Sequence, residues 1–159
     1  MYPLTHFLVS FFIGLVLVKQ GYFTMLQALY TGLVGLLIDV DHFVYFVIKK
    51  KSFNFKNAWN AAIKHTLDER TSLVHHLPGF LIFSFLILVL FFVSKIWFWI
   101  FFIGYYSHMI LDFLNFKKWL EVNRRVKFKE EGFLFNIPLY EIVFICVLVI
   151  LILVTLFYY

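Results

Sequence analysis

Five long apolar runs, separated by polar links, constrain this chain more than any other feature of its sequence. About 20 apolar residues can cross a bilayer as a helix, because each helical residue advances about 1.5 Å. The composition agrees with this, since 63% of the 159 residues are hydrophobic and only 14% are charged. We therefore expect one all-α, polytopic membrane domain over residues 1–159, with about five transmembrane helices in a bundle. The expected spans are 4–18, 22–48, 77–93, 96–116 and 137–159.

The basic residues predict how the bundle is oriented. Twelve of the 14 Lys and Arg lie in the two long links, 49–76 and 115–136, and the two tight links hold only Lys19 and Lys95. Because basic loops stay on the cytoplasmic side, we expect the N-terminus and both long loops inside the cell and the C-terminus outside, in a plasma or inner membrane. This bias accounts for the net charge of +5, so we expect contact with membrane lipids and no nucleic-acid partner.

The links and the single cysteine add smaller expectations. Residues 57–69 read "NAWNAAIKHTLDE", in which apolar residues recur at helical spacing, so we expect a short interfacial helix there. The second long link has no clean period, and its structure is left open. Cys146 is the only cysteine, which excludes an intramolecular disulfide and a paired-cysteine metal site.

Ionisable residues inside the apolar runs are the main functional signal, because such groups are costly in a membrane unless they are paired, hydrated or bound to a ligand. His108 and Asp112 are four residues apart, and Asp39 and His42 are three apart, so each pair shares one face of a helix. Asp41 falls off that face in a regular helix. Either the helix loosens there or Asp41 supports the ligands indirectly.

The predicted topology brings these residues together at the cytoplasmic end of the bundle. Imidazole with carboxylate, and no thiolate, fits one or two divalent metal ions, with Zn²⁺ favoured and Mn²⁺ or Fe²⁺ as alternatives. Asp39 and Asp41 are also candidates for the general base, and Arg70 for binding a substrate phosphate or pairing with a carboxylate. The predicted metal ligands are His6, Asp39, Asp41, His42, His75, His76, His108 and Asp112.

Each of these groups also has a plainer interpretation. His108 and Asp112 would form a hydrogen-bonded pair that holds helices together, and the acidic cluster around His42 would be a helix end facing headgroups. Glu141 would offset the dipole at a helix start, and its function and that of His65 are left open.

Three motifs resemble the YdjM-type family of membrane-bound, metal-dependent hydrolases of bacteria and archaea. They are "LLIDVDHF" at 36–43, "RTSLVHH" at 70–76 and "GYYSHMILDFL" at 104–114. With the N-terminal histidine, the resemblance extends over most of the first 115 residues. The family pattern matches Asp39, Asp41, His42, His108 and Asp112 directly, and His6 by position. Just before the middle motif, Glu69 stands where the pattern has a histidine ahead of the arginine. His75 and His76 remain alternatives for the ligand in this motif.

The residues and the resemblance together predict a hydrolase of ester or phosphoester bonds. A site at headgroup depth favours a lipid-like or amphiphilic substrate, because the polar group of such a molecule lies at that level. Two other functions use the same residues: a transporter of divalent cations or protons, and a membrane adaptor without enzymatic activity. Transport would need polar residues toward the outer face, where the sequence offers few, and an adaptor would purify without stoichiometric metal.

Overall fold

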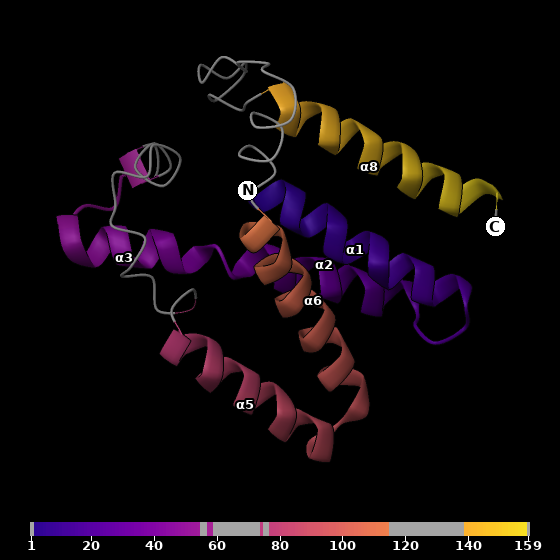
Figure 1. The fold of residues 1–159 in the computed structure, drawn as a ribbon, viewed down its shortest axis with the longest axis horizontal. Helices are drawn as coiled ribbons and strands as arrows, with labels where there is room; N and C mark the ends of the chain where they lie inside the picture. The colour runs from indigo at the N-terminus through magenta and orange to yellow at the C-terminus, as the bar shows by residue number, and fades with distance from the viewer. Residues whose placement is uncertain (1, 55–56, 59–73, 75–76, 115–138, 159) are drawn as a thin grey trace. The chain divides into compact units, whose positions relative to one another are not determined.

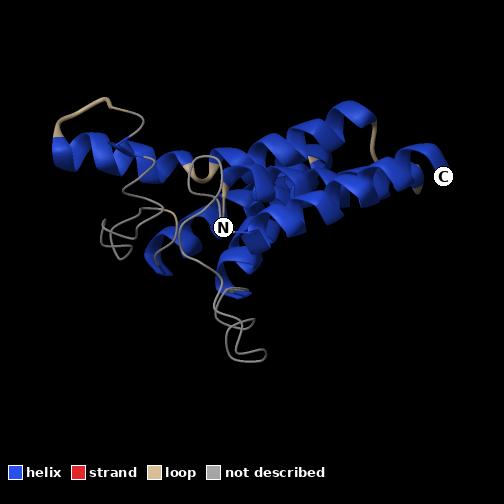
Figure 2. Ribbon diagram, turned by 90° about the horizontal axis from the view of Figure 1, so that it is seen from above, coloured by secondary structure: helices blue, strands red, loops and turns tan. Residues whose placement is uncertain are grey.

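The part of the chain that the structure describes is mostly helical. The computed structural model describes residues 2–54, 57–58, 74, 77–114 and 139–158. Within these ranges there are helices and short connections and no strand (Figure 2), which confirms the predicted all-α class. The helices are α1 (Pro3–Lys19), α2 (Met25–Leu37), α3 (Val40–Lys50), α5 (Leu77–Val93), α6 (Lys95–Leu114) and α8 (Leu139–Tyr158) (Figure 1).

Several of these helices have the length and apolar surface of membrane spans. Among the described residues, three stretches are long and apolar enough to cross a bilayer: Met25–Lys50, Lys95–Leu114 and Leu139–Tyr158. The apolar helices α1 and α5 have 17 residues each, about 25 Å, which is near the lower limit for a span. Large apolar side chains are exposed along α5, α6 and α8, as expected for surfaces that face lipid. The chain is therefore a helical membrane protein.

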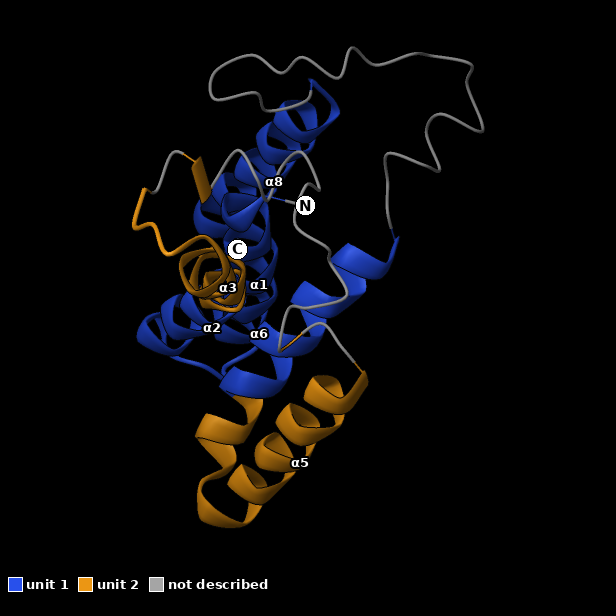
Figure 3. Cartoon of the chain, turned by 90° about the vertical axis from the view of Figure 1, so that its left-hand side faces the viewer, with its two compact units in different colours: residues 1–36, 100–159 blue, residues 37–99 orange. Residues whose placement is uncertain are grey.

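The chain forms two compact units, which are described separately (Figure 3). The first unit comprises Met1–Leu36 and Ile100–Tyr159, and so contains α1, α8 and most of α2 and α6. The second comprises Leu37–Trp99, with α3 and α5. The predicted interfacial helix, apart from residues 57–58, and the link at 115–136 lie outside the described residues.

A short connection with a capping box joins α1 to α2. The backbone N–H of Thr24 donates to the side-chain oxygen of Gln27 at 2.7 Å, and the N–H of Gln27 donates to the Thr24 hydroxyl at 3.3 Å. These reciprocal bonds satisfy two N–H groups that a helix start leaves without partners. Helix α2 therefore begins directly after the turn and returns antiparallel to α1.

Two glycines allow α2 to lie close to its neighbours in the first unit. A Cβ built on Gly35 would lie 2.2 Å from the Ser10 hydroxyl oxygen of α1, and one built on Gly104 of α6 would lie 2.7 Å from the Val34 Cβ. No real side chain tolerates such distances, so both positions require glycine for the observed packing. Small residues at these contacts are typical of helix packing in membranes.

The interior of the first unit is unusually polar. In a membrane protein the apolar surface can face lipid, so polar groups gather where helices contact one another. They come from α1, α2, α6 and α8, and the buried polar residues of the described chain are Thr5, His6, Ser10, Thr31, Ser107, His108 and Glu141. Two histidines and an acid are thus among the most buried side chains of the protein.

Candidate metal centre

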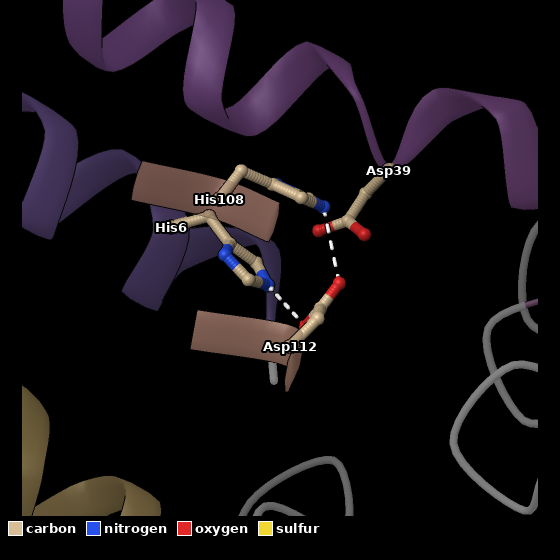
Figure 4. Close-up of side chains that lie close together, drawn as sticks. All are labelled: His6, Asp39, His108 and Asp112. Carbon is tan, nitrogen blue, oxygen red and sulfur yellow. Dashed lines mark ion pairs between the residues drawn. The ribbon is translucent and has the colours of Figure 1, made fainter. Parts of the chain in front are cut away.

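Two buried histidines share one aspartate in the first unit. The Nε2 atom of His6, on α1, lies 3.1 Å from Oδ1 of Asp112, and the Nε2 atom of His108, on α6, lies 3.2 Å from Oδ2 of the same carboxylate (Figure 4). The two imidazole rings stack with their centroids 3.8 Å apart. Both histidines are fully buried, whereas the Asp112 side chain is 25% exposed. Three side chains from two helices therefore converge on one small region with access to its surroundings on the Asp112 side.

The local sequence explains how these three side chains meet. His108 and Asp112 are four residues apart in α6, so they lie on one face one turn apart. On α1, Ser10 follows His6 by one turn, and its hydroxyl lies 2.7 Å from that of Ser107, the residue before His108. This buried hydrogen bond, together with the close approach at Gly35, fixes the register of α1 against α6 and brings the two imidazoles into contact.

A backbone carbonyl fixes the orientation of His108. Its Nδ1 atom lies 2.8 Å from the carbonyl oxygen of Gly35. A carbonyl oxygen can only accept a hydrogen bond, so Nδ1 carries the hydrogen and Nε2 is directed at Asp112. Histidines that bind metal usually have such a partner on the second nitrogen, because it sets the tautomer and the direction of the ring.

The charges around Asp112 favour a positive centre between the three groups. If His108 is neutral, its Nε2 lone pair faces a carboxylate oxygen, and two acceptors at 3.2 Å repel each other unless a proton or a cation lies between them. If both stacked imidazoles were protonated, two like charges would be buried 3.8 Å apart with one carboxylate to balance them, which is costly. A single positive charge, carried either by a bound cation or by one protonated imidazole beside a neutral one, satisfies both nitrogens and both oxygens.

The three side chains fit the ligand set of a divalent metal ion. Metal–ligand distances of about 2.0–2.2 Å place neighbouring ligand atoms about 3.0–3.5 Å apart, and the two N···O separations fall in that range. The same separations suit hydrogen bonds, so the residue types carry the argument. Two histidines and one carboxylate are a ligand set of catalytic zinc and of non-haem iron sites. Zinc, manganese and iron all remain consistent with the site.

Three further predicted ligands lie together in the second unit. His42 Nε2 lies 4.0 Å from Asp39 Oδ1, and His42 Nδ1 lies 3.8 Å from Asp41 Oδ1. The predicted run 22–48 contains two helices rather than one, because α2 ends at Leu37 and α3 begins at Val40. The loosening of the helix considered for Asp41 is therefore present, and both acids lie close to His42.

The same acidic group is connected to the segment of the middle motif. The backbone N–H of Val74 donates to Asp41 Oδ2 at 3.3 Å, and Val74 immediately precedes His75 in the chain. Arg70, His75 and His76 themselves lie outside the described residues, as does His65. Their predicted roles stay predictions.

Some supporting groups were not predicted from the sequence. They are the Gly35 carbonyl and the hydrogen-bonded hydroxyls of Ser10 and Ser107. The sequence signal for them is weak, because it consists only of Gly35 and Ser10 being small residues one helical turn from a predicted ligand. For Glu141 the sequence suggests an offset to the dipole of its own helix and leaves its function open. Its Oε1 atom instead accepts a hydrogen bond from the backbone N–H of Tyr2, at the start of α1.

Comparison with known proteins assigns the chain to a family. The model of the family described as YdjM inner membrane protein matches residues 1–119, three quarters of the chain, and this range includes every predicted metal ligand. Helix α8 lies beyond it. Neither the curated proteins nor the solved structures gave a significant match. The family match and the apolar helices together show that this chain belongs to the YdjM inner membrane protein family.

Proposed function

We propose that this protein is a metal-dependent hydrolase that cleaves an ester or phosphoester bond of an amphiphilic, lipid-like substrate at the cytoplasmic face of the membrane. The observation that carries the proposal is the convergence of the two Nε2 atoms of His6 and His108 on the two oxygens of Asp112. These three residues would be the protein ligands of the metal. Asp112 is the most accessible of them, because both histidines are fully buried.

Asp39 is the fourth residue that we assign to this site. It follows Gly35 by four residues, and the Gly35 carbonyl accepts the hydrogen of His108. Four residues span at most about 14 Å even when fully extended, so the sequence limits the distance between Asp39 and Gly35. We assign it the role of further ligand or of general base for the attacking water.

We also assign Asp41, His42 and Arg70 to the site, as the sequence predicts. Asp41 and His42 lie next to Asp39 in the same acidic group, and the bond from Val74 to Asp41 connects this group to the chain segment that carries His75 and His76. Arg70 offers a planar guanidinium that matches the oxygens of a phosphate. It is the residue that we assign to hold a phosphoester substrate.

The chemistry divides between the metal and the protein. A bound divalent cation would supply a Lewis acid and lower the pKa of a water molecule toward neutrality. The Gly35 carbonyl keeps His108 in the tautomer that directs the Nε2 lone pair at Asp112, and Asp112 would contribute a negative charge to the metal site. Asp39 or Asp41 takes the proton that the water loses on attack. Because both histidines are buried, they would limit the access of bulk water to a metal bound there.

The location of the site favours an amphiphilic substrate. The basic residues of the two long links predict that this end of the bundle faces the cytoplasm. A lipid-like molecule in the inner leaflet presents its ester or phosphoester at the same depth. The basic residues of these links would also attract anionic headgroups.

Elemental analysis of the detergent-purified protein, together with hydrolysis assays on a panel of lipid esters and phosphoesters, tests this function. We expect about one or two equivalents of Zn²⁺, Mn²⁺ or Fe²⁺ per chain, and turnover of at least one class of substrate. His108→Ala and Asp39→Ala should each lose metal and activity, which would connect two separate sequence motifs to one centre.

His65→Ala is the matched control, because it removes a histidine that is not among the predicted ligands. It should retain both metal and activity. A wild-type protein that purifies without metal and binds none when Zn²⁺ or Mn²⁺ is added would contradict the proposal and favour an adaptor. Metal binding without hydrolysis, combined with metal flux into liposomes, would favour a transporter.

A further inference from the structure

Glu141 of α8 is a fully buried acid that contacts the start of another helix. Its Oε1 atom accepts a hydrogen bond from the backbone N–H of Tyr2, at 2.9 Å, and another from the hydroxyl of Thr5. Tyr2 precedes α1 and Thr5 lies in its first turn, immediately before His6. Glu141 lies outside the range that the family model matches. A helix beyond that range thus contacts the turn of α1 that carries one of the two stacked histidines.

The position of Glu141 follows from the needs of the α1 start. The first N–H groups of a helix lack partners inside the helix, and the Tyr2 side chain makes no capping hydrogen bond. A carboxylate supplied by another helix satisfies one of these groups and is stabilised by the positive end of the helix dipole. Because a buried carboxylate is costly without such donors, Glu141 and the first turn of α1 hold each other in place.

The opposite ends of α1 and α8 are joined by a second contact. The Nζ atom of Lys19, in the last turn of α1, donates to the backbone carbonyl of Leu156 near the end of α8, at 3.4 Å. Helices α1 and α8 pack against each other (Figure 1), and the two contacts show that they run parallel. Lys19 therefore offers a natural comparison, because it joins the same two helices at the end of α1 away from His6.

We propose that Glu141 is a positioning residue for His6. By holding the first turn of α1 against α8, it keeps the His6 imidazole stacked on His108 and its Nε2 directed at Asp112. Helix α8 is therefore part of the support of the site, although the family match ends before it. The metal-binding part of this inference rests on the proposed function, whereas the placement of the His6 ring does not.

The hydrogen bonds of Glu141 define which substitutions are informative. Both bonds fall on Oε1, and Oε2 accepts none from the described residues. Glu141→Gln can therefore place its amide oxygen where Oε1 lies and keep both bonds, whereas Glu141→Ala removes both. Thr5→Val removes one donor and leaves the carboxylate in place. Lys19→Met is the control for loss of an α1–α8 contact that does not involve the His6 turn.

The experiment measures the full-length variants in detergent in two ways. Without metal, NMR of histidine-labelled protein follows the ring C–H signals of His6, which are assigned by their loss in His6→Gln. The ring current of the stacked His108 shifts these signals, so they report the position of the His6 ring. With metal, titration with Co²⁺ gives the affinity and the visible spectrum of the centre. We expect Glu141→Ala to move the His6 signals and to weaken Co²⁺ binding by about tenfold or more. Thr5→Val should do the same in smaller degree, and Glu141→Gln and Lys19→Met should resemble the wild type.

Several results would overturn the inference. Unchanged His6 signals in Glu141→Ala would do so, as would a Lys19→Met variant that moves them equally, since α8 would then act only on overall stability. If Glu141→Ala does not fold, Thr5→Val replaces it in the test, and unchanged His6 signals in Thr5→Val would overturn the inference. If the wild type binds no Co²⁺, the proposed function fails, but the metal-free NMR comparison still decides whether Glu141 positions His6.

Discussion

His108 donates its Nδ1 hydrogen to the carbonyl oxygen of Gly35 across 2.8 Å, and this bond connects a fully buried imidazole of α6 to the backbone of α2. The contact requires α2 to lie close to its neighbours, which the absence of a side chain at Gly35 allows. It leaves Nε2 as the only nitrogen of His108 that can bind a cation. That nitrogen is directed at the Asp112 carboxylate, which His6 also faces. The first prediction concerns this carboxylate.

Asp112→Asn should abolish tight metal binding while leaving the bundle folded. The amide has nearly the same shape as the carboxylate but no negative charge, so the two stacked imidazoles lose the group that balances a cation. We expect the affinity for Zn²⁺ to fall by about 100-fold or more, which corresponds to about 2.7 kcal/mol. Competition with a chromophoric chelator in detergent measures this change.

Asp68→Asn is the control for Asp112→Asn, because Asp68 is an acid outside the predicted ligand set. Its affinity for Zn²⁺ should equal that of the wild type. Equal affinities in Asp112→Asn and the wild type would place the metal elsewhere in the chain.

Gly35→Ala should destabilise the first unit and disturb the site. The added methyl carbon would lie 2.2 Å from the Ser10 hydroxyl oxygen and 3.0 Å from the His6 carbonyl oxygen, so α1 must move away from α2. Overpacking of this kind costs about 1–3 kcal/mol. The melting temperature in detergent should fall, and adding Ser10→Ala should restore only part of the loss, because the Ser10 Cβ is itself 2.9 Å from the new carbon. A melting temperature equal to that of the wild type would mean that the helices can separate here without cost.

Substitutions of Ser10 and Ser107 should have non-additive effects on the free energy of unfolding, because the two side chains share a hydrogen bond. Ser10→Ala and Ser107→Ala each remove one hydroxyl of a buried pair whose oxygens lie 2.7 Å apart. Hydrogen bonds between membrane helices are worth about 0.6 kcal/mol on average, so the double variant should lose less stability than the two single variants together. Unfolding in mixtures of SDS and a mild detergent measures the three free energies. Strict additivity would show that the two hydroxyls do not interact.

The fold class and the main ligand candidates followed from the sequence because each rests on a local rule. An apolar run of sufficient length forms a helix in a bilayer, since every backbone polar group must be satisfied internally. The spacing of His108 and Asp112 placed them on one face without any knowledge of neighbouring helices. The meeting of His6 with this pair was expected from their shared depth in the membrane and from the position of His6 in the family pattern.

The supporting contacts could not be predicted in this way, because they depend on how particular helices approach one another. The acceptor for His108 is a backbone carbonyl, a group that every residue has, and only the packing selects Gly35. Glu141 accepts hydrogen bonds from Thr5 and Tyr2, which lie 136 and 139 positions earlier in the chain. The turn between α2 and α3 interrupts a run whose composition is that of one continuous helix.

The orientation in the membrane gives a prediction that is independent of the metal. The excess of Lys and Arg in the long links predicts that Lys51 lies on the cytoplasmic side and Tyr159 outside. In a Cys146→Ser background, which removes the only cysteine, we expect Lys51→Cys to react with a membrane-impermeant maleimide only after the cells are opened. Tyr159→Cys should react in intact cells. The reverse pattern would invert the proposed topology and place the site at the outer face.

Zn²⁺ should stabilise the wild-type protein and not the variant that lacks His108. A ligand that binds only the folded state at 100 times its dissociation constant adds about 2.7 kcal/mol of stability, which for a chain of this size raises the melting temperature by about 5–10 °C. Thermal unfolding in detergent should show this shift for the wild type and little or none for His108→Ala, in which the imidazole oriented by Gly35 is missing. Mg²⁺ at the same concentration is the control, because it prefers six oxygen ligands and retains much of its water. An equal shift by Zn²⁺ in both proteins would mean that the stabilising ion binds outside the His6–His108–Asp112 site.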